Sequence, residues 1–342
     1  MAILVTGASG YIGSFACVRL LGEGFGVVGI DNFSNSGAEV VERINELAPK
    51  KLRFYEADLR DAAALDKIFK AERIDCVMHF AGLKAVGVSV SKPLEYYGNN
   101  INAAISLCEC MDRHDTGAIV FSSSATVYDG ANEMPLTEDS KTGGCTNPYG
   151  WTKFMCEQII ADIARAKGWT ASIFRYFNVI GAHESGRIGD DPSGTPNNLM
   201  PYITQVAVGR LECLPLNGTD YPTPDGTCIR DYIHISDLID GHIAAVKNAN
   251  KNAGVNFYNL GTGRGTSNLE LIETFEQING VRVPYRATKR RPGDLAVTYA
   301  DASKARRELG WSPKKSVEDM CADAWRWQKN NPEGYGRNAE KP

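Results

Sequence analysis

The side chains best suited to chemistry in this sequence are a tyrosine and a lysine four residues apart, Tyr149 and Lys153. They follow Asn147 and Pro148, residue types that favour a helix cap and a first helical turn. The pair is therefore predicted to share one helix face. A tyrosine has a pKa near ~10, and an ammonium ~4 Å away in an effective dielectric of ~20 would favour its phenolate by about 4 kcal/mol. The spacing predicts a tyrosine that takes a proton from a hydroxyl, although two ordinary helix-surface residues would be spaced alike.

Three consecutive serines, Ser122, Ser123 and Ser124, stand at the end of the apolar run 118–122. One of them could supply a third member of the site. The carboxyl ends of strands carry the ligand site in parallel α/β sheets. Ser124 is predicted to hydrogen-bond the substrate oxygen and to relay its proton to Tyr149. Ser122 and Ser123 could instead only form hydrogen bonds at the strand end. Spacing alone does not decide which of the three serines relays the proton.

A glycine-rich segment predicts the cofactor. Gly7, Gly10 and Gly13 follow the first apolar run and open a helical stretch, where unpaired N–H groups and the helix dipole attract a pyrophosphate. A tight strand-to-helix turn is the alternative. Asp31 follows the second apolar run at the distance expected for a carboxylate that accepts from the adenosine ribose. Because this carboxylate would repel a 2′-phosphate, NAD is predicted rather than NADP.

Two later strand ends extend the predicted cofactor site. Asp58 follows the third apolar run and is placed to accept from the adenine amino group. Phe80, Ala81 and Gly82 follow the fourth, where a glycine lets the backbone pass close to a ligand. Simple turns are the alternative at both places.

The elements that must position these residues are short apolar runs alternating with helical stretches, which is typical of parallel βαβ units. The runs do not alternate with polar residues, so they are predicted to be strands buried on both faces. They cover residues 3–6, 27–30, 52–56, 76–80, 118–122 and 171–176. The expected fold class is α/β, a doubly wound, Rossmann-type parallel sheet with a smaller mixed α/β substrate domain.

The rhythm of the sequence changes near residue 180, where prolines punctuate a stretch predicted to be rich in loops until a helical pattern resumes near Ser236. Residues 1–180 are predicted to form the NAD-binding domain. Residues 181–342 are predicted to form the substrate domain, with some segments after residue 225 returning to the first. The residues after Asn330 are predicted to trail away from the fold.

Composition excludes several classes of function. The chain has 342 residues, 43% hydrophobic and 23% charged, with a net charge of -4, so there is no basic excess to indicate a nucleic acid or membrane partner. The positions of the nine cysteines show no paired spacing. Together with the five histidines they form no metal-ligand pattern. We expect reduced thiols, no metal and, because a strand begins by Ile3, a cytoplasmic protein without a signal peptide.

At this level of detail the chain resembles the extended short-chain dehydrogenase/reductase superfamily and, within it, the UDP-glucose 4-epimerase family. The resemblance covers essentially the whole chain, and its first and catalytic motifs are common to the superfamily. The matching segments are residues 7–14, 79–87, 93–97 with Asn99 and Asn100, 122–128, 175–178, 196–202, 225–227, 230–234 and 290–294.

The resemblance implies tightly held NAD and a UDP-hexose substrate. Tyr149 would remove the 4′-hydroxyl proton while hydride passes to the cofactor, the 4-keto sugar would turn, and hydride would return to its other face. A homodimer is also implied. Further cofactor contacts are implied for Tyr11, Ile12, Asn32, Asn35, Ser36, Leu59, Lys84, Asn99, Ser122, Lys153 and Tyr176.

The same resemblance implies a set of substrate contacts in the second half of the chain. Arg230 and Arg291 can neutralise a diphosphate, and Asp294 can accept from ribose hydroxyls. The full set is Lys84, Ser124, Tyr149, Phe177, Asn178, Asn198, Leu199, Pro215, Asn217, Arg230, Tyr232, Arg291, Asp294 and Thr298. Thr298 aligns with a position beside the sugar that varies in size within the family, and its small side chain is expected to admit a 2-acetamido group.

Three other functions share parts of this pattern. A nucleotide-sugar 4,6-dehydratase would have the same cofactor site, but related dehydratases carry an aspartate and a glutamate where this chain has Ala125 and Thr126, which cannot act as a general acid/base pair. A non-catalytic NAD sensor would not need Tyr149 and Lys153. A simple dehydrogenase that releases NADH would differ in requiring added cofactor.

Overall fold

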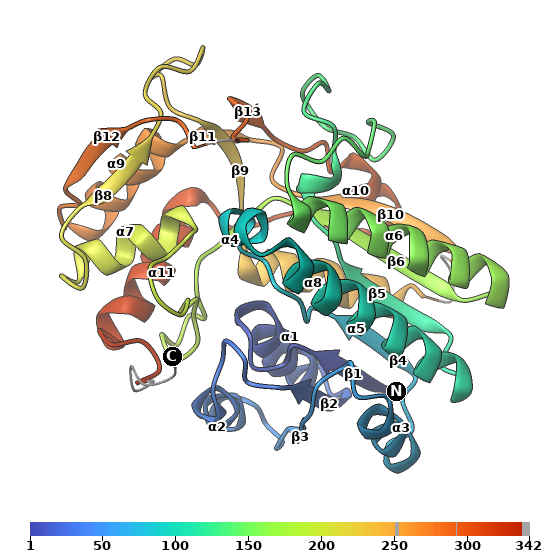
Figure 1. Ribbon diagram of the computed structural model, residues 1–342. Coiled ribbons are helices and arrows are strands. Elements are labelled where there is room, and N and C mark those ends of the chain that lie inside the picture. The colour runs from blue at the N-terminus through green and yellow to red at the C-terminus, as the bar shows by residue number, and fades with distance from the viewer. Residues whose placement is uncertain (250–252, 292, 337–342) are drawn as a thin grey trace.

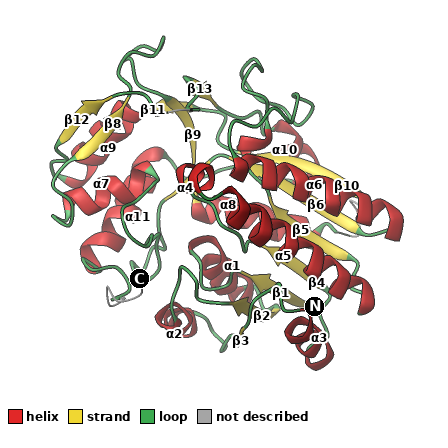
Figure 2. Ribbon diagram, in the orientation of Figure 1, coloured by secondary structure: helices red, strands yellow, loops and turns green. Residues whose placement is uncertain are grey.

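A computed structural model describes residues 1–249, 253–291 and 293–336. In it, the predicted strand segments of the first half lie side by side in one parallel sheet (Figures 1 and 2). Within these described residues the sheet has seven strands. In spatial order they are β10 (Val255–Leu260), β6 (Thr170–Tyr176), β5 (Ala118–Ser122), β4 (Cys76–His79), β1 (Ala2–Thr6), β2 (Gly26–Asp31) and β3 (Arg53–Glu56). This arrangement confirms the doubly wound, Rossmann-type fold class.

Both faces of this sheet are buried, as the unbroken apolar runs predict. On β1, Ile3 and Val5 belong to one core cluster and Leu4 to the other, and all three side chains are completely buried. Side chains alternate between the two faces of a strand, so an apolar run supplies both cores at once.

The helices cover the sheet in two layers. One core cluster joins β1 to α1 (Tyr11–Gly22), α2 (Ala38–Leu47) and α8 (Ile235–Lys247). The other joins the opposite face to α3 (Ala62–Ala71), α5 (Pro93–Arg113) and α6 (Pro148–Lys167). The short helices α4 (Val86–Ser91), η1 (Ala125–Val127) and α10 (Ser303–Leu309) lie at strand ends or connections.

The smaller part of the molecule holds the remaining elements (Figure 1). They are β7 (Asn178–Ile180), α7 (Leu199–Ala207), β8 (Leu214–Asn217), β9 (Ile229–His234), β11 (Gly265–Ser267), α9 (Asn268–Asn279), β12 (Tyr285–Thr288), β13 (Val297–Thr298) and α11 (Val317–Asn330). β9 pairs in parallel with β7 and β13 and antiparallel with β11. This mixed sheet confirms the smaller second unit, whereas the predicted boundary at residue 180 stays a prediction.

The stretch between residues 180 and 235 is rich in loops, as predicted, and α7, β8 and β9 lie within it and bury an apolar core against α9 and α11. Pro201 lies in the first turn of α7 and Pro215 lies in β8. One expectation about the second half needs correction: the segment after Asn330 does not trail away, since Asn331 and Tyr335 are buried. Residues 337–342 lie outside the described part of the chain, as do residues 250–252 and Pro292.

The layer between α8 and the sheet contains a buried histidine that should make stability depend on pH. His242 is surrounded by the rings of Phe80, Phe174 and Tyr176. Its Nδ1 donates to the carbonyl oxygen of Leu238 at 2.9 Å, and its Nε2 has no hydrogen-bond partner in the described residues. Burial lowers the pKa of His242 to about 4.

Acid should therefore destabilise the protein through His242. The unfolded histidine binds a proton below a pKa of ~6.5, whereas the folded one does so only near pH 4, so stability falls as pH drops through this window. Between pH 7.5 and 5.5 the wild type should lose about 1 kcal/mol more of its free energy of unfolding than a His242→Phe variant. Urea titrations of both proteins at the two pH values would measure this, and equal losses would contradict it.

Candidate active site

A long cleft runs along the carboxyl ends of β1, β2, β3 and β4, with an empty volume of about 1480 Å³ including the solvent at its mouth. Most of the predicted cofactor residues line it: Gly7, Gly10, Tyr11, Ile12, Gly13, Asp31, Asn32, Asn35, Ser36, Asp58, Leu59, Phe80, Ala81, Gly82, Lys84 and Asn99. Segments distant in sequence meet here because parallel strands end at the same edge of a sheet.

The glycines at the start of α1 leave the backbone open to a ligand. Gly7 has φ +69°, and a Cβ there would lie 2.9 Å from the backbone nitrogen of Ala81. A Cβ on Gly13 would lie 2.0 Å from the carbonyl oxygen of Gly7, so no larger residue fits. The first turn of α1 therefore presents its N–H groups to the cleft, which fits the pyrophosphate of a dinucleotide.

Asp31 at the end of β2 organises the adjoining loop. Its Oδ2 accepts from the backbone N–H of Ser9 at 3.1 Å, and its Oδ1 accepts from the N–H of Phe33 at 3.0 Å. The hydroxyl of Ser36 donates to the same Oδ1 at 3.2 Å. A carboxylate has further lone pairs, so Asp31 can still accept from a ribose diol that enters the cleft.

Asp58 lines the cleft beside Asn32, which donates to its Oδ2 at 3.0 Å. Arg60 donates hydrogen bonds to both carboxylate oxygens of Asp58, from Nε at 2.9 Å and from Nη2 at 2.6 Å. The hydrogen bonds from Arg60 hold the pKa of Asp58 well below its usual range. Asp58 is thus a fixed anion at the cleft wall, and the contact to adenine stays a prediction.

The predicted proton-transfer pair lies near the start of α6, next to the end of β5. The side chain of Asn147 accepts from the N–H of Gly150 at 2.9 Å and caps the helix, as the sequence predicts. The ammonium of Lys153 donates to the carbonyl oxygen of Ser122 at 2.7 Å and lies 6.0 Å from the centre of the Tyr149 ring. Tyr96, which lines the cofactor cleft, is close enough to raise the pKa of Tyr149.

The expectation that this pair alone favours the phenolate is wrong. Burial raises the pKa of Tyr149 to about 12, and only its hydrogen bond with Ser124 acts in the opposite direction. Burial also lowers the pKa of Lys153 to about 8. Both charged forms are disfavoured away from water, and the ammonium bonds to a carbonyl instead of to the phenol. Ionising Tyr149 therefore needs more positive charge than Lys153 supplies.

The structure separates the three serines that spacing left open. Ser124 lies close enough to Tyr149 to lower its pKa, and it caps η1, accepting from the N–H and the hydroxyl of Thr126 at 3.2 and 3.0 Å. Ser123 donates to Glu157 at 2.5 Å, and the hydroxyl of Ser122 bonds to that of Tyr176. Ser124 is the one placed to relay a proton to Tyr149.

The predicted substrate residues gather where the two parts of the molecule meet. Lys84, Asn198 and Arg291 line a second pocket beside the cofactor cleft, with an empty volume of about 510 Å³. Arg230 and Arg291 both approach Asp294, with nitrogen–oxygen distances of 3.8 and 2.9 Å.

Four of the other predicted substrate residues lie on the mixed sheet. Thr298 on β13 pairs with Arg230 on β9, and Asn178 on β7 pairs with Tyr232. Leu199 opens α7, and Pro215 and Asn217 lie on β8, which forms a separate two-stranded sheet with β12. Phe177, the residue between β6 and β7, is buried in a small cluster that includes Tyr128.

Two of these residues have side chains that are already engaged. Tyr232 is 2% exposed, packs in the core of the second unit and donates to the side chain of Asn268 at 3.1 Å. Its side chain packs in the core beside Arg230, and its contact with the substrate stays a prediction. Asn217 accepts from the hydroxyl of Thr288 at 2.9 Å, which ties β8 to β12.

Residues to which the sequence assigned no role in the site hold it together. Asn100 donates to the carbonyl oxygen of Leu83 at 3.1 Å and to the hydroxyl of Thr152 at 3.0 Å, which joins the cofactor cleft to α6. Glu157 binds both Ser123 and Arg175 inside the fold. Glu157 follows Lys153 by four residues, so helical spacing was the available signal for it.

A helix start open to a pyrophosphate and a proton-transfer pair at the same sheet edge belong together in one class, the NAD-dependent short-chain dehydrogenases/reductases. The family model described as GDP-mannose 4,6 dehydratase matches residues 4–324. A UDP-glucose 4-epimerase of Bacillus subtilis is 55% identical over 336 residues, covering 98% of this chain and 99% of that protein. The human UDP-glucose 4-epimerase is 50% identical over 344 residues, with the same coverage.

Solved structures of UDP-glucose 4-epimerases are also similar to this chain. The UDP-glucose 4-epimerase of Bifidobacterium longum, in complex with NAD+ and UDP, superposes with a TM-score of 0.95 at 48% identity over 98% of this chain and 100% of that one. The enzyme of Stenotrophomonas maltophila with bound NAD has a TM-score of 0.94 at 47% identity, over 96% and 98%. This chain belongs to the UDP-glucose 4-epimerase family, and its cofactor is NAD.

None of the helices in the described residues is long and apolar enough to cross a membrane. No group of three or more histidine, cysteine, aspartate or glutamate side chains in that part of the chain could hold a metal ion.

Proposed function

We propose that this protein interconverts UDP-galactose and UDP-glucose by inverting C4′ of the hexose. The observation that carries the proposal is the placement of Tyr149, Lys153 and Ser124 at the end of β5, beside a cleft shaped for a dinucleotide. The high identity to UDP-glucose 4-epimerases across bacteria and mammals supports it.

The chain's own residues have defined tasks in this reaction. Ser124 binds the 4′-oxygen and passes its proton to Tyr149, which returns it after inversion. NAD, when bound, supplies a hydride acceptor at C4′ and a positive charge near Tyr149. Because burial alone raises the pKa of Tyr149 to about 12, the tyrosine becomes a useful base only when Lys153 and that added charge act together.

The two arginines of the second unit would hold the nucleotide while the sugar turns. Arg230 is mostly buried and Arg291 partly exposed, and both are near Asp294. A diphosphate placed between them would replace part of this ion pairing with charge-assisted hydrogen bonds. Firm anchoring of the nucleotide leaves the hexose free to present either face.

The test is to incubate the purified protein with UDP-galactose without added NAD and to separate the products by chromatography. UDP-glucose should form to equilibrium. A requirement for stoichiometric added NAD would instead indicate a dehydrogenase, and loss of water from the sugar would indicate a 4,6-dehydratase. The dehydratase is disfavoured because Ala125 and Thr126 offer no carboxylate, and the hydroxyl of Thr126 already donates to Ser124.

We also propose that the enzyme accepts UDP-N-acetylgalactosamine and UDP-N-acetylglucosamine. Thr298 is small and pairs with Arg230 at the edge where the nucleotide-sugar would lie. A related protein of Campylobacter jejuni, 34% identical with a TM-score of 0.83, is named a UDP-Glc/GlcNAc 4-epimerase.

Enlarging Thr298 should narrow this range. We expect Thr298→Tyr to lower kcat/KM for UDP-N-acetylgalactosamine at least ten-fold, because a ring there would fill the space for the acetamido group, an effect of about 1.4 kcal/mol or more. Turnover of UDP-galactose should change far less, and Thr298→Ser should behave like the wild type. Wild-type protein that leaves the N-acetylated substrate untouched would refute the proposal.

A homodimer remains our proposal for the assembly. Apolar side chains are exposed on neighbouring helices of one layer: Val90 on α4 at 63%, Leu94 and Ile105 on α5 at 85% and 36%, and Met155 on α6 at 38%. A second copy of the chain would cover them. Sedimentation should show a dimer that Leu94→Asp weakens and the control Ile278→Asp, on α9, does not. The cytoplasmic location stays a prediction.

A further inference from the structure

A loop that no sequence motif marked as functional crosses the cofactor cleft. Residues 186–193, here called the strap, lie between β7 and α7. Five of them, Gly189, Asp190, Asp191, Pro192 and Ser193, line the same cleft as the glycines of α1. Any dinucleotide in the cleft would therefore lie between α1 and the strap.

The strap is tied to the opposite side of the cleft by charge. The ammonium of Lys84, in the loop after β4, lies 3.6 Å from Oδ1 of Asp190, which is 14% exposed. On the outer side, Arg210 lies 3.8 Å from Oδ1 of Asp191. These pairings matter because two unpaired carboxylates facing a pyrophosphate would repel it.

The C-terminal segment, residues 331–336, packs against the strap, and its Tyr335 also lines the cleft. The hydroxyl of Tyr335 accepts from the N–H of Gly189 at 3.1 Å and donates to the carbonyl oxygen of Gly189 at 3.2 Å. The backbone N–H of Tyr335 donates to Asp191 at 3.0 Å, and the side chain of Asn331 donates to the carbonyl oxygen of Gly186 at 2.9 Å. We call this segment the clamp.

The contact between strap and clamp leaves no room for larger residues. A Cβ on Gly189 would lie 2.3 Å from the ring of Trp327, and a Cβ on Gly334 would lie 2.3 Å from the carboxylate of Asp191. The rings of Trp327 and Tyr335 are 4.6 Å apart, and the guanidinium of Arg43 lies 4.8 Å from the Tyr335 ring. The strap is thus held closely on the clamp side.

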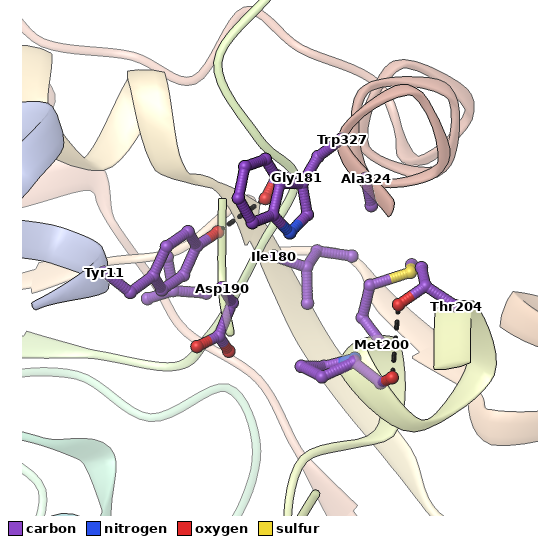
Figure 3. A pocket seen from close by; sticks show the side chains of 10 residues that line it. Tyr11, Ile180, Gly181, Asp190, Met200, Thr204, Ala324 and Trp327 are labelled. Carbon is purple, nitrogen blue, oxygen red and sulfur yellow. Dashed lines mark hydrogen bonds between the residues drawn. The ribbon is translucent and has the colours of Figure 1, made fainter. Parts of the chain in front are cut away.

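The inner side of the strap faces a small pocket. Figure 3 shows that Tyr11, Asp190 and Trp327 project into this pocket from three separate parts of the chain. Its interior volume is about 10 Å³, room for about one water molecule, and the Nε1 of Trp327 is buried with no hydrogen-bond partner among the described residues. The clamp supplies the hydrogen bonds to Gly186, Gly189 and Asp191 that position the strap.

We propose that the clamp holds the strap closed over bound NAD and thereby sets how slowly NAD leaves the enzyme, with Tyr335 as the positioning residue. The inference rests on the proposed function, since an epimerase regenerates its cofactor in every cycle and gains from retaining it. Tyr335 acts through Gly189 and Asp191 and takes no part in the proton transfer.

The test measures NAD release directly. Purified holoenzyme is mixed with an NAD-consuming reporter, alcohol dehydrogenase with ethanol, and the NADH that it forms reports the rate at which NAD leaves. Tyr335→Phe keeps the ring that packs against Trp327 and removes the hydroxyl bonded to Gly189. Tyr285→Phe is the matched control, because Tyr285 is 47% exposed on β12. Asn331→Ala tests the clamp at a second point.

We expect NAD to leave Tyr335→Phe about ten-fold faster than it leaves the wild type. Release from Asn331→Ala should also be faster, and release from Tyr285→Phe should match the wild type. Activity lost on dilution should return when NAD is added, with the KM for UDP-galactose within two-fold of the wild type. Unchanged NAD release from both clamp variants, with or without a lower melting temperature, would overturn the proposal. Wild-type protein that neither carries nor binds NAD would overturn the cofactor site and the clamp with it.

Discussion

Replacing Tyr149 with phenylalanine should lower kcat for UDP-galactose about 10³-fold, within the range that positioned acid–base groups contribute. The phenol is buried with Ser124 close enough to lower its pKa, and the ammonium of Lys153 is fixed nearby by the carbonyl oxygen of Ser122. The ring would remain in Tyr149→Phe, but Ser124 would have no group to which it could pass a proton.

Two further measurements separate loss of chemistry from loss of structure. NAD content per chain and melting temperature should stay close to the wild type in Tyr149→Phe, since the cofactor cleft is built from other elements. Ser124→Ala should lower kcat less, because water can occupy the place of its hydroxyl. If Tyr149→Phe retained a tenth or more of wild-type kcat, Tyr149 would not be the base.

The second large effect is expected on stability, from Glu157→Gln. Glu157 is completely buried on α6, and its carboxylate accepts from Nε and Nη2 of Arg175 at 2.9 and 2.8 Å and from Ser123 at 2.5 Å. This ion pair keeps the pKa of Arg175 above its usual range. Removing the anion leaves a buried guanidinium without a counter-charge, which should cost about 3 kcal/mol of unfolding free energy.

An exposed pair on the same helix gives the matched control. Asp162 and Arg165 form an ion pair at 3.0 Å with both side chains more than half exposed, and Asp162→Asn should change stability by about 0.5 kcal/mol or less. Denaturant titrations of the two variants beside the wild type would measure both effects. Comparable losses from the two substitutions would show that the buried network is not the stabilising feature we infer.

Glu157 also connects stability to the active site. Through Ser123 it fixes the end of β5, and the next residue, Ser124, carries the proton relay. A cavity or charge defect at Glu157 should therefore lower kcat as well, more than it changes the KM for the UDP-sugar. The exposed Asp162→Asn change should alter neither quantity.

Local patterns by themselves determined the sheet, the glycine turn after β1 and the shared helix face of Tyr149 and Lys153. These depend on interactions between residues close in sequence: apolar runs buried on both faces, a helix start that only glycine fits, and a four-residue helical spacing. Even the choice of NAD could be argued from Asp31 at the end of one strand.

Tertiary structure alone decided which groups surround each of these residues, and hence what they do. It directed Lys153 to a carbonyl, raised the pKa of Tyr149 through burial, and made Ser124 the one of the three serines that lowers the pKa of that tyrosine. It also brought Tyr335 onto Gly189, 146 residues away in the chain. Desolvation and long-range hydrogen bonds depend on every element packed around a side chain, and no local spacing encodes them.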